Sequence, residues 1–209
     1  VLASIFETHA TENEPFVSAD CNPDDECVIL FTGGTTGTPK GAMLTHRNIL
    51  YTAQNVCYHE RAVPEDVALC FMPLNHVFGG NHIMNSNFYG CGSLVLHKSF
   101  DMDRVLSSIQ AEKITRFYSV PTVYIRLLNT ENSRRYLASL TYCFSAATSM
   151  ASEIVRQWQE KFELTIHEAY PGHYVQFEYA NRHPSLIRNV LSSGVFVEGW
   201  AVYTEQTLL

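Results

Sequence analysis

Residues 27–41 read CVILFTGGTTGTPKG, an apolar run followed by a loop of glycine, threonine and a single lysine. The apolar residues 28–31 predict a strand. The loop offers backbone N–H groups, hydroxyl groups and the Lys40 cation, and its glycines let the backbone approach an anion closely. The order Lys40-Gly41 differs from the P-loop, in which Ser or Thr follows Gly-Lys. Two interpretations are open here: a phosphate-binding loop, or an ordinary surface turn between a strand and a helix.

The chain beyond this loop alternates between apolar runs and helical patterns. Further strands are expected at 67–71, 93–96, 115–120 and 140–144, and helices at 46–59, at 101–112, from Pro121 onward and at 151–162. Thr45 and Asp101 can cap two of these helices with their side chains, and Pro121 suits the first position of a third. Alternation of this kind predicts an α/β fold with a mainly parallel sheet and flanking helices.

Several stretches resemble the adenylate-forming (AMP-binding) enzymes, most closely the long-chain acyl-CoA synthetases. Residues 32–48, TGGTTGTPKGAMLTHRN, resemble the family's phosphate-binding signature. Residues 71–79, FMPLNHVFG, resemble its second signature, with Asn75 where an aromatic residue is usual. The stretches 119–122 (SVPT) and 140–147 (LTYCFSAA) follow in the family's order. The resemblance covers about residues 1–166 and implies a fragment of the N-terminal part of such an enzyme.

The resemblance implies an ATP-dependent, AMP-forming fatty acyl-CoA ligase whose small-molecule partners are ATP with Mg²⁺, a fatty acid and coenzyme A. His76 would lie near the reacting carboxylate as a catalytic residue. The expected phosphate contacts are Thr32, Gly33, Gly34, Thr35, Thr36, Gly37, Thr38 and Lys40. The expected adenine contacts are Ser145, Ala146, Ala147, Thr148 and Tyr170.

The pattern changes after the helix expected at 151–162. The family continues with a buried strand and the motif Gly-Tyr-Gly-x-Thr-Glu, whose Thr meets phosphate and whose Glu helps to hold magnesium. Here Ala169 replaces the first Gly, and the Thr and Glu are missing. The ribose motif, the hinge and the catalytic Lys of the C-terminal lid are also missing. We therefore expect that this chain is not competent alone.

Residues 163–209 resemble a bacterial family named domain of unknown function 885, whose members are regarded as helical zinc-dependent peptidases. The similarity lies in 167–173, HEAYPGH, and in 197–205, VEGWAVYTE. It implies zinc ligands at His167, His173 and Glu198, with Glu168 as the general base. The two resemblances meet in 163–170, which suggests a chimera of two fragments. The alternatives are then a zinc hydrolase fragment or a remnant without activity.

The spacing of the two histidines argues against zinc. His167 and His173 are six residues apart, which is about 240° around a regular helix, whereas the HExxH motif uses four residues. Pro171 and Gly172 could break the helix and restore convergence. Otherwise the histidines face solvent or make hydrogen bonds, so we expect no tightly held zinc.

Composition limits the remaining classes. The net charge is -7. Its excess comes from acidic residues that precede Lys40, the first Lys or Arg of the chain: Glu7, Glu12, Glu14, Asp20, Asp24, Asp25 and Glu26. We interpret 1–26 as an acidic linker, 27–166 as a partial AMP-binding domain and 167–209 as a helical segment. The acidic balance argues against nucleic acid. Without an apolar stretch near 18 residues, a signal peptide or paired cysteines, we expect a cytoplasmic chain with reduced thiols.

Overall fold

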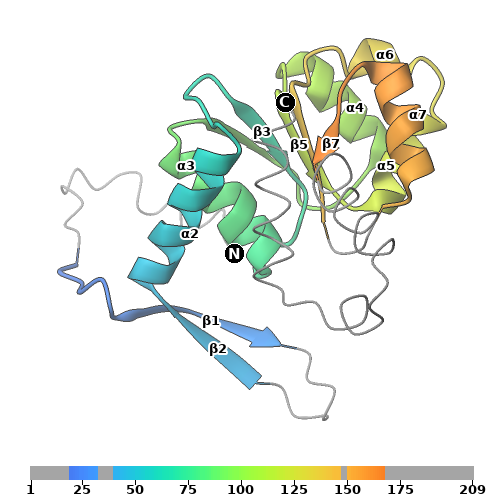
Figure 1. The fold of residues 1–209 in the computed structure, drawn as a ribbon. Coiled ribbons are helices and arrows are strands. Elements are labelled where there is room, and N and C mark those ends of the chain that lie inside the picture. Colours follow the sequence, from blue (N-terminus) through green and yellow to red (C-terminus); the bar gives the residue numbers. More distant parts are fainter. Residues whose placement is uncertain (1–18, 33–39, 147–149, 168–209) are drawn as a thin grey trace, which may run out of the picture.

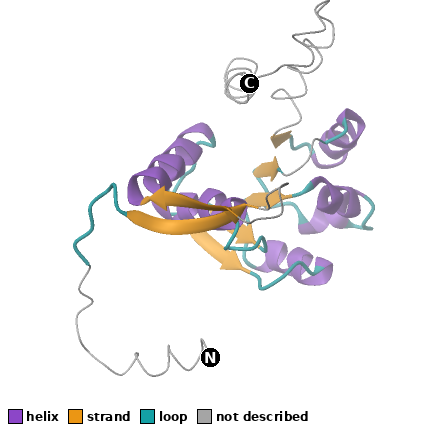
Figure 2. Cartoon of the chain, turned by 90° about the horizontal axis from the view of Figure 1, so that it is seen from below, coloured by secondary structure: helices purple, strands orange, loops and turns teal. Residues whose placement is uncertain are grey.

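The computed structural model describes residues 19–32, 40–146 and 150–167. A five-stranded parallel sheet, in the order β4-β3-β5-β6-β7, lies at its centre. Its strands are β3 (Val67–Cys70), β4 (Ser93–Leu96), β5 (Arg116–Ser119), β6 (Tyr142–Ser145) and β7 (Ile166–His167). Helices lie on both sides of the sheet (Figures 1 and 2). The predicted α/β fold with a mainly parallel sheet is confirmed.

One face of the sheet carries the larger part of the core. Leu69, Phe117 and Cys143, from three neighbouring strands, pack there against helices. These are α4 (Met102–Ala111), α5 (Pro121–Leu128), α6 (Ser133–Tyr136) and α7 (Ser152–Phe162). The fully buried Trp158 of α7 belongs to this core. The four helices lie together on one side in Figure 1.

The other face receives the alternate residues of the same strands, because successive side chains of a strand point to opposite faces. Ala68, Cys70 and Tyr118 form a second cluster there with Ile83. Ile83 belongs to η1 (Phe78–Asn85), a π-helix that leads into α3 (Ser86–Tyr89). Helix α2 (His46–His59) packs against η1 and α3. The sequence did not predict η1, because two consecutive glycines weaken a helical pattern.

The predicted helix starts are confirmed. The Thr45 hydroxyl accepts the Asn48 N–H at 3.2 Å, and the Asn48 side chain accepts the Thr45 N–H at 3.1 Å, a reciprocal cap for α2. The Asp101 carboxylate accepts the Arg104 N–H at 2.9 Å and caps α4. Pro121 occupies the first turn of α5, where its missing N–H has no partner to lose. Each start is thus fixed by residues within a few positions of it.

The strand predicted at 28–31 does not join the parallel sheet. It forms β1 (Glu26–Thr32), which pairs antiparallel with β2 (Lys40–Thr45) in a separate two-stranded sheet. This hairpin extends away from the layered part of the chain (Figure 1). Its outward face exposes Ile29, Phe31 and Met43. The loop therefore connects two extended strands, and not a strand and a helix.

Two other expectations have different outcomes. All six cysteines are free, but only Cys70 and Cys143 are buried, whereas Cys21 and Cys91 are exposed. Two of the six thiols therefore belong to the core. The division into 1–26, 27–166 and 167–209 stays a prediction, and the helical segment expected after residue 167 lies outside the described residues.

Candidate functional site

Four of the predicted site residues lie at one edge of the sheet. His76 follows β3, Ser145 ends β6 and is followed by Ala146, and His167 ends β7. All five strands are parallel, so these positions share the carboxyl edge of the sheet. The chain passes from β3 to β4 on one side and then returns to β5 on the other side. Ligands of open α/β sheets bind outside the carboxyl ends of the strands at such a reversal.

The loop that carries His76 is held by backbone contacts. The His76 N–H donates to the Pro73 carbonyl at 3.1 Å, and the Gly80 N–H donates to the His76 carbonyl at 2.9 Å. A Cβ on Gly79 would meet the Pro73 carbonyl oxygen at 2.3 Å, and one on Gly80 would meet that of Leu74 at 2.4 Å. The close approach of η1 to residues 73–74 therefore requires glycine at 79 and 80.

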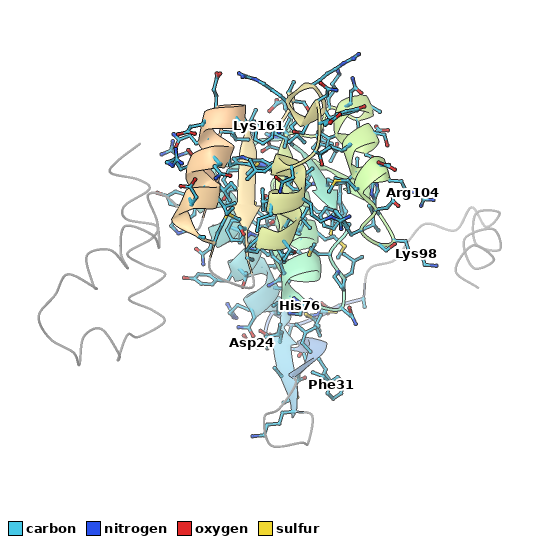
Figure 3. The ribbon with its side chains drawn as sticks, turned by 90° about the vertical axis from the view of Figure 1, so that its right-hand side faces the viewer. Asp24, Phe31, His76, Lys98, Arg104 and Lys161 are labelled. Atoms are coloured by element: carbon cyan, nitrogen blue, oxygen red, sulfur yellow. The ribbon has the colours of Figure 1, made fainter. Side chains whose placement is uncertain are left out.

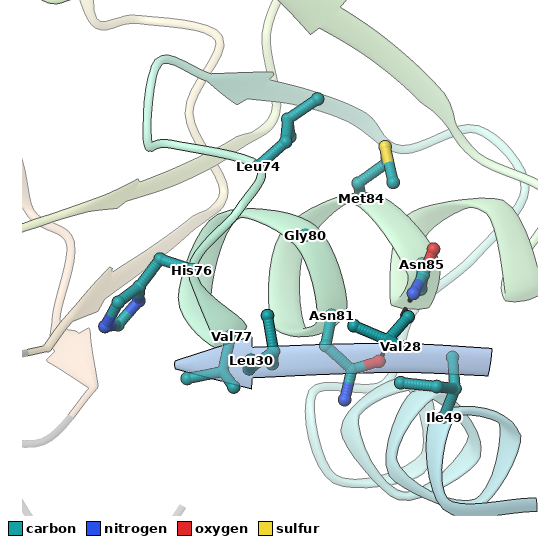
Figure 4. A pocket seen from close by; sticks show the side chains of 10 residues that line it. All are labelled: Val28, Leu30, Ile49, Leu74, His76, Val77, Gly80, Asn81, Met84 and Asn85. Carbon is teal, nitrogen blue, oxygen red and sulfur yellow. Dashed lines mark hydrogen bonds between the residues drawn. The ribbon is translucent and has the colours of Figure 1, made fainter. Parts of the chain in front are cut away.

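The imidazole of His76 has one ring nitrogen engaged. The Phe78 backbone N–H donates to His76 Nδ1 at 3.2 Å. Since Nδ1 accepts this hydrogen bond, the neutral ring carries its proton on Nε2. The side chain is exposed and points away from the other residues drawn around it in Figure 4. His76 can therefore present an N–H donor to an anionic group at the carboxyl edge.

The end of β6 is fixed to β5. Ser145 pairs with Ser119 in the strand register, and the Ala146 N–H donates to the Ser119 carbonyl at 3.0 Å. Both serine side chains are buried. Ala147 and Thr148, the other two residues expected near adenine in this segment, lie outside the described residues.

The glycine-rich loop is anchored by the hairpin. Thr32 and Lys40 are register partners at the open end of the β1–β2 ladder, and Lys40 is exposed. The loop residues Gly33, Gly34, Thr35, Thr36, Gly37 and Thr38 lie outside the described residues. Figure 3 shows Phe31 on the projecting hairpin and His76 near its base. The base of β1, the strand that leads into the glycine-rich loop, therefore lies beside the loop that carries His76.

A small pocket marks the seam between the hairpin and the His76 loop (Figure 4). Val28 and Leu30 of β1 line it together with His76 and Val77, and η1 and α2 supply its other walls. Its volume is about 100 Å³, whereas pockets for drug-sized ligands measure roughly 300–1,000 Å³. The pocket is therefore too small for a nucleotide. Its lining residues show that β1 lies against the His76 loop.

Of the residues expected to bind zinc or act beside it, only His167 lies in the described part of the chain. His167 lies in β7, as expected for the buried strand of an adenylate-forming enzyme and not for a metal-site helix. Glu168, Tyr170, His173 and Glu198 lie outside the described residues. Over 19–32, 40–146 and 150–167, no three His, Cys, Asp or Glu residues form a group that could hold a metal ion.

Sequence reasoning missed a buried ionic cluster, which we call the Glu60 cluster: Glu60, Asp66, His82, Arg116 and Tyr118. Arg116 binds Asp66 at 2.5 Å and Glu60 at 3.2 Å. Burial opposes the charge of Arg116, but Tyr118 and Asp66 favour it more strongly and raise the pKa of the guanidinium. Burial, and then the Glu60 charge, raises the pKa of Tyr118. The sequence signal that could have revealed this cluster is a charged residue, Arg116, inside the strand predicted at 115–120.

Comparison with known proteins agrees with this geometry. The family described as AMP-binding enzyme matches residues 3–171. A feruloyl-CoA synthase of Amycolatopsis sp is 35% identical over 56% of this chain and 24% of its own. The long-chain-fatty-acid–CoA ligase of Bacillus subtilis (strain 168) is 31% identical over 88% of this chain and 34% of its own. The chain therefore spans about a quarter to a third of these relatives.

A solved structure of a related protein has a similar fold. The crystal structure of ATP-bound MatB from Rhodopseudomonas palustris superposes with a TM-score of 0.69 and 28% identity, over 78% of this chain and 32% of that one. Across the described ranges, no helix is long and apolar enough to cross a membrane.

These matches also bear on the segment where two resemblances met. The family match continues to residue 171. The Bacillus subtilis ligase covers 88% of 209 residues, about 184, so that match runs past residue 170 wherever it begins. The similarity to CoA ligases thus continues through 163–170. The resemblance to a zinc peptidase and the chimera interpretation receive no support from these comparisons.

Proposed function

The chain belongs to the AMP-binding enzyme family, and on that premise we propose that it holds the ATP phosphates and the reacting carboxylate of an ATP-dependent acyl-CoA ligase. The proposal rests on the contact between β1 and the His76 loop in Figure 4. There β1, which leads into the glycine-rich loop, shares a pocket with His76. The strand that leads into the loop and the imidazole therefore lie beside the same pocket.

In this proposal the loop binds the β- and γ-phosphates of ATP. Thr32, Lys40 and the glycine- and threonine-rich residues 33–38 supply N–H groups, hydroxyl groups and a cation. Fixed donors of this kind favour the negative charge that develops on a departing pyrophosphate. Ser145, Ala146, Ala147, Thr148 and Tyr170 would contact adenine. The family's magnesium-binding Glu is missing after Tyr170, so Mg²⁺ would arrive on the phosphates of ATP.

His76 is assigned to the carboxylate. Its Nε2–H would donate to a carboxylate oxygen and orient the other oxygen toward the α-phosphorus of ATP. That oxygen forms a bond to phosphorus, the bond to the bridging oxygen breaks, and pyrophosphate leaves. The thiol of coenzyme A then attacks the acyl carbon, loses its proton, and AMP leaves. The second step is assigned to a complete ligase of this family and not to these residues alone.

A fatty acid is the proposed acyl substrate, as the first resemblance implied. The named relatives include both a long-chain-fatty-acid–CoA ligase and a feruloyl-CoA synthase, so an aromatic acid is the competing outcome. Acyl-adenylate analogues in which a sulfamoyl group replaces the phosphate separate the two without turnover. We expect the palmitoyl analogue to bind at least tenfold more tightly than the feruloyl analogue. The reverse order would reassign the substrate.

The assignment of ATP is tested with the purified chain by equilibrium dialysis of MgATP and by exchange of labelled pyrophosphate into ATP. We expect weak binding, and exchange far below that of the Bacillus subtilis ligase in parallel, because the chain lacks several family motifs. Absence of MgATP binding at millimolar concentration would overturn the proposal.

A further inference from the structure

We propose that Glu60 is a positioning residue, which sets the orientation of η1 and, through it, the imidazole of His76. The importance of His76 rests on the proposed function, but the coupling between Glu60 and His76 does not. The proposal concerns the Glu60 cluster, which contributes none of the residues expected to touch ATP.

One buried carboxylate joins three elements of the fold. Glu60 follows α2 as its C-terminal cap, and its side chain is 6% exposed. Its Oε1 receives the Nε2–H of His82 at 2.8 Å, from η1. Its Oε2 receives the Tyr118 hydroxyl at 2.6 Å and an Arg116 N–H at 3.2 Å, both from β5. Helix α2, helix η1 and the sheet therefore meet at this group.

His82 carries the connection to the end of β6. Its ring lies 4.6 Å from that of Phe144, centroid to centroid, and 5.7 Å from that of Tyr118. Phe144 directly precedes Ser145, which is expected beside adenine. The position of His82 thus fixes how η1 lies against the carboxyl ends of β5 and β6.

The same helix fixes His76. Phe78, the first residue of η1, donates its N–H to His76 Nδ1, and Gly80 donates to the His76 carbonyl. A rotation or shift of η1 moves both donors at once. The glycines at 79 and 80 leave no space for the loop to adjust, because they lie against backbone carbonyl groups. The protonation site of His76 should therefore respond to the bond between His82 and Glu60.

The charge content of the cluster argues that it does more than fill the core. Two carboxylates and one guanidinium are buried together. Removing charged groups from water is costly, and apolar replacements of similar volume often stabilise a protein equally well. What apolar residues cannot supply is a directional bond that fixes one orientation of η1.

The test uses the full chain labelled with ¹⁵N-histidine and needs no nucleotide. Long-range ¹H–¹⁵N spectra report which ring nitrogen is protonated, and a His76→Gln variant assigns the His76 signals. Wild type should show the Nε2–H tautomer. In Glu60→Gln and His82→Phe we expect loss of that single tautomer and exchange between the two forms. Glu160→Gln removes an exposed partner of Arg156 and should leave the His76 signals unchanged.

Tyr118→Phe is a milder variant, because it removes only one hydrogen bond from Glu60. It keeps the proposal testable if Glu60→Gln or His82→Phe does not fold. His76 signals identical to wild type in every folded variant, accompanied only by a lower Tm, would overturn the proposal. MgATP binding is recorded separately on the same samples. A shifted tautomer in a chain that does not bind ATP would overturn the proposed function and leave the role of Glu60 intact.

Discussion

Gly79 lies so close to Pro73 that a Cβ at position 79 would meet the Pro73 carbonyl oxygen at 2.3 Å. Because the obstacle is backbone, it cannot rotate away as a side chain could. Gly79→Ala should therefore lower the free energy of unfolding by about 1–3 kcal/mol, the usual range for overpacking. Urea denaturation followed by circular dichroism measures this change.

Gly90→Ala is the matched control for that substitution. Its φ is −76°, which suits alanine, and its nearest neighbour would be the Ala62 Cβ at 3.3 Å. We expect a smaller loss than for Gly79→Ala, because small shifts of the Ala62 and Cys57 side chains relieve contacts at 3.3 and 3.4 Å. Equal effects at the two glycines would show that the approach of η1 to residues 73–74 is not as tight as described.

Tyr124 joins two strands of the sheet from α5. Its buried hydroxyl lies 3.0 Å from the Phe117 carbonyl of β5 and 2.8 Å from the Phe144 carbonyl of β6. Tyr124→Phe keeps the ring and removes the donor from buried carbonyl groups, which should cost about 1–3 kcal/mol. Tyr58→Phe, at a residue that is 72% exposed, is the control and should change little. A similar loss in both variants would contradict the assigned role.

Stability should decline on the alkaline side because of Cys143. Burial raises the pKa of this thiol above the ordinary value of 9.0. Below that value the thiol is protonated in both states; above it, the unfolded thiol loses its proton and the folded one does not. Deprotonation therefore favours unfolding as pH rises through the unfolded pKa and on toward the folded one. Over pH 8 to 9.5 the loss should be about 0.5–1 kcal/mol.

Cys143→Ser removes that titration, so the unfolding free energy should depend less on pH over the same interval, whatever its absolute value. Denaturation is measured with a reductant present to keep all thiols reduced. Parallel curves for wild type and variant would contradict the account.

Local signals predicted the starts of the elements well. The capping by Thr45 and Asp101, and the placement of Pro121, depend on residues within three positions, so the sequence carries them directly. The alternation of strands and helices predicted the parallel sheet, and the resemblance predicted a strand after the 151–162 helix, which the structure has as β7. What periodicity alone could not tell was that β1 belongs to a separate hairpin.

The missed features depend on long-range contacts. Helix η1 contains two glycines and forms where they fit against the carbonyl groups of Pro73 and Leu74. Glu60 and Arg116 are 56 residues apart, so the sequence near either residue does not predict their contact. The site residues were predicted mainly from contiguous motifs. The roles assigned to the loop and to His76 stay predictions until ligand binding is measured.

The most direct test of the account is the dissociation constant of MgATP for wild type and Lys40→Ala, measured by equilibrium dialysis at one ionic strength. One charge-assisted contact contributes about 1.5–3 kcal/mol, so the substitution should weaken binding roughly 10- to 150-fold. Lys113→Ala, before β5 at the opposite edge of the sheet, removes the same charge and should leave the constant unchanged. An equal constant for wild type and Lys40→Ala, or an equal loss in both variants, would contradict the assignment of the glycine-rich loop as the phosphate site.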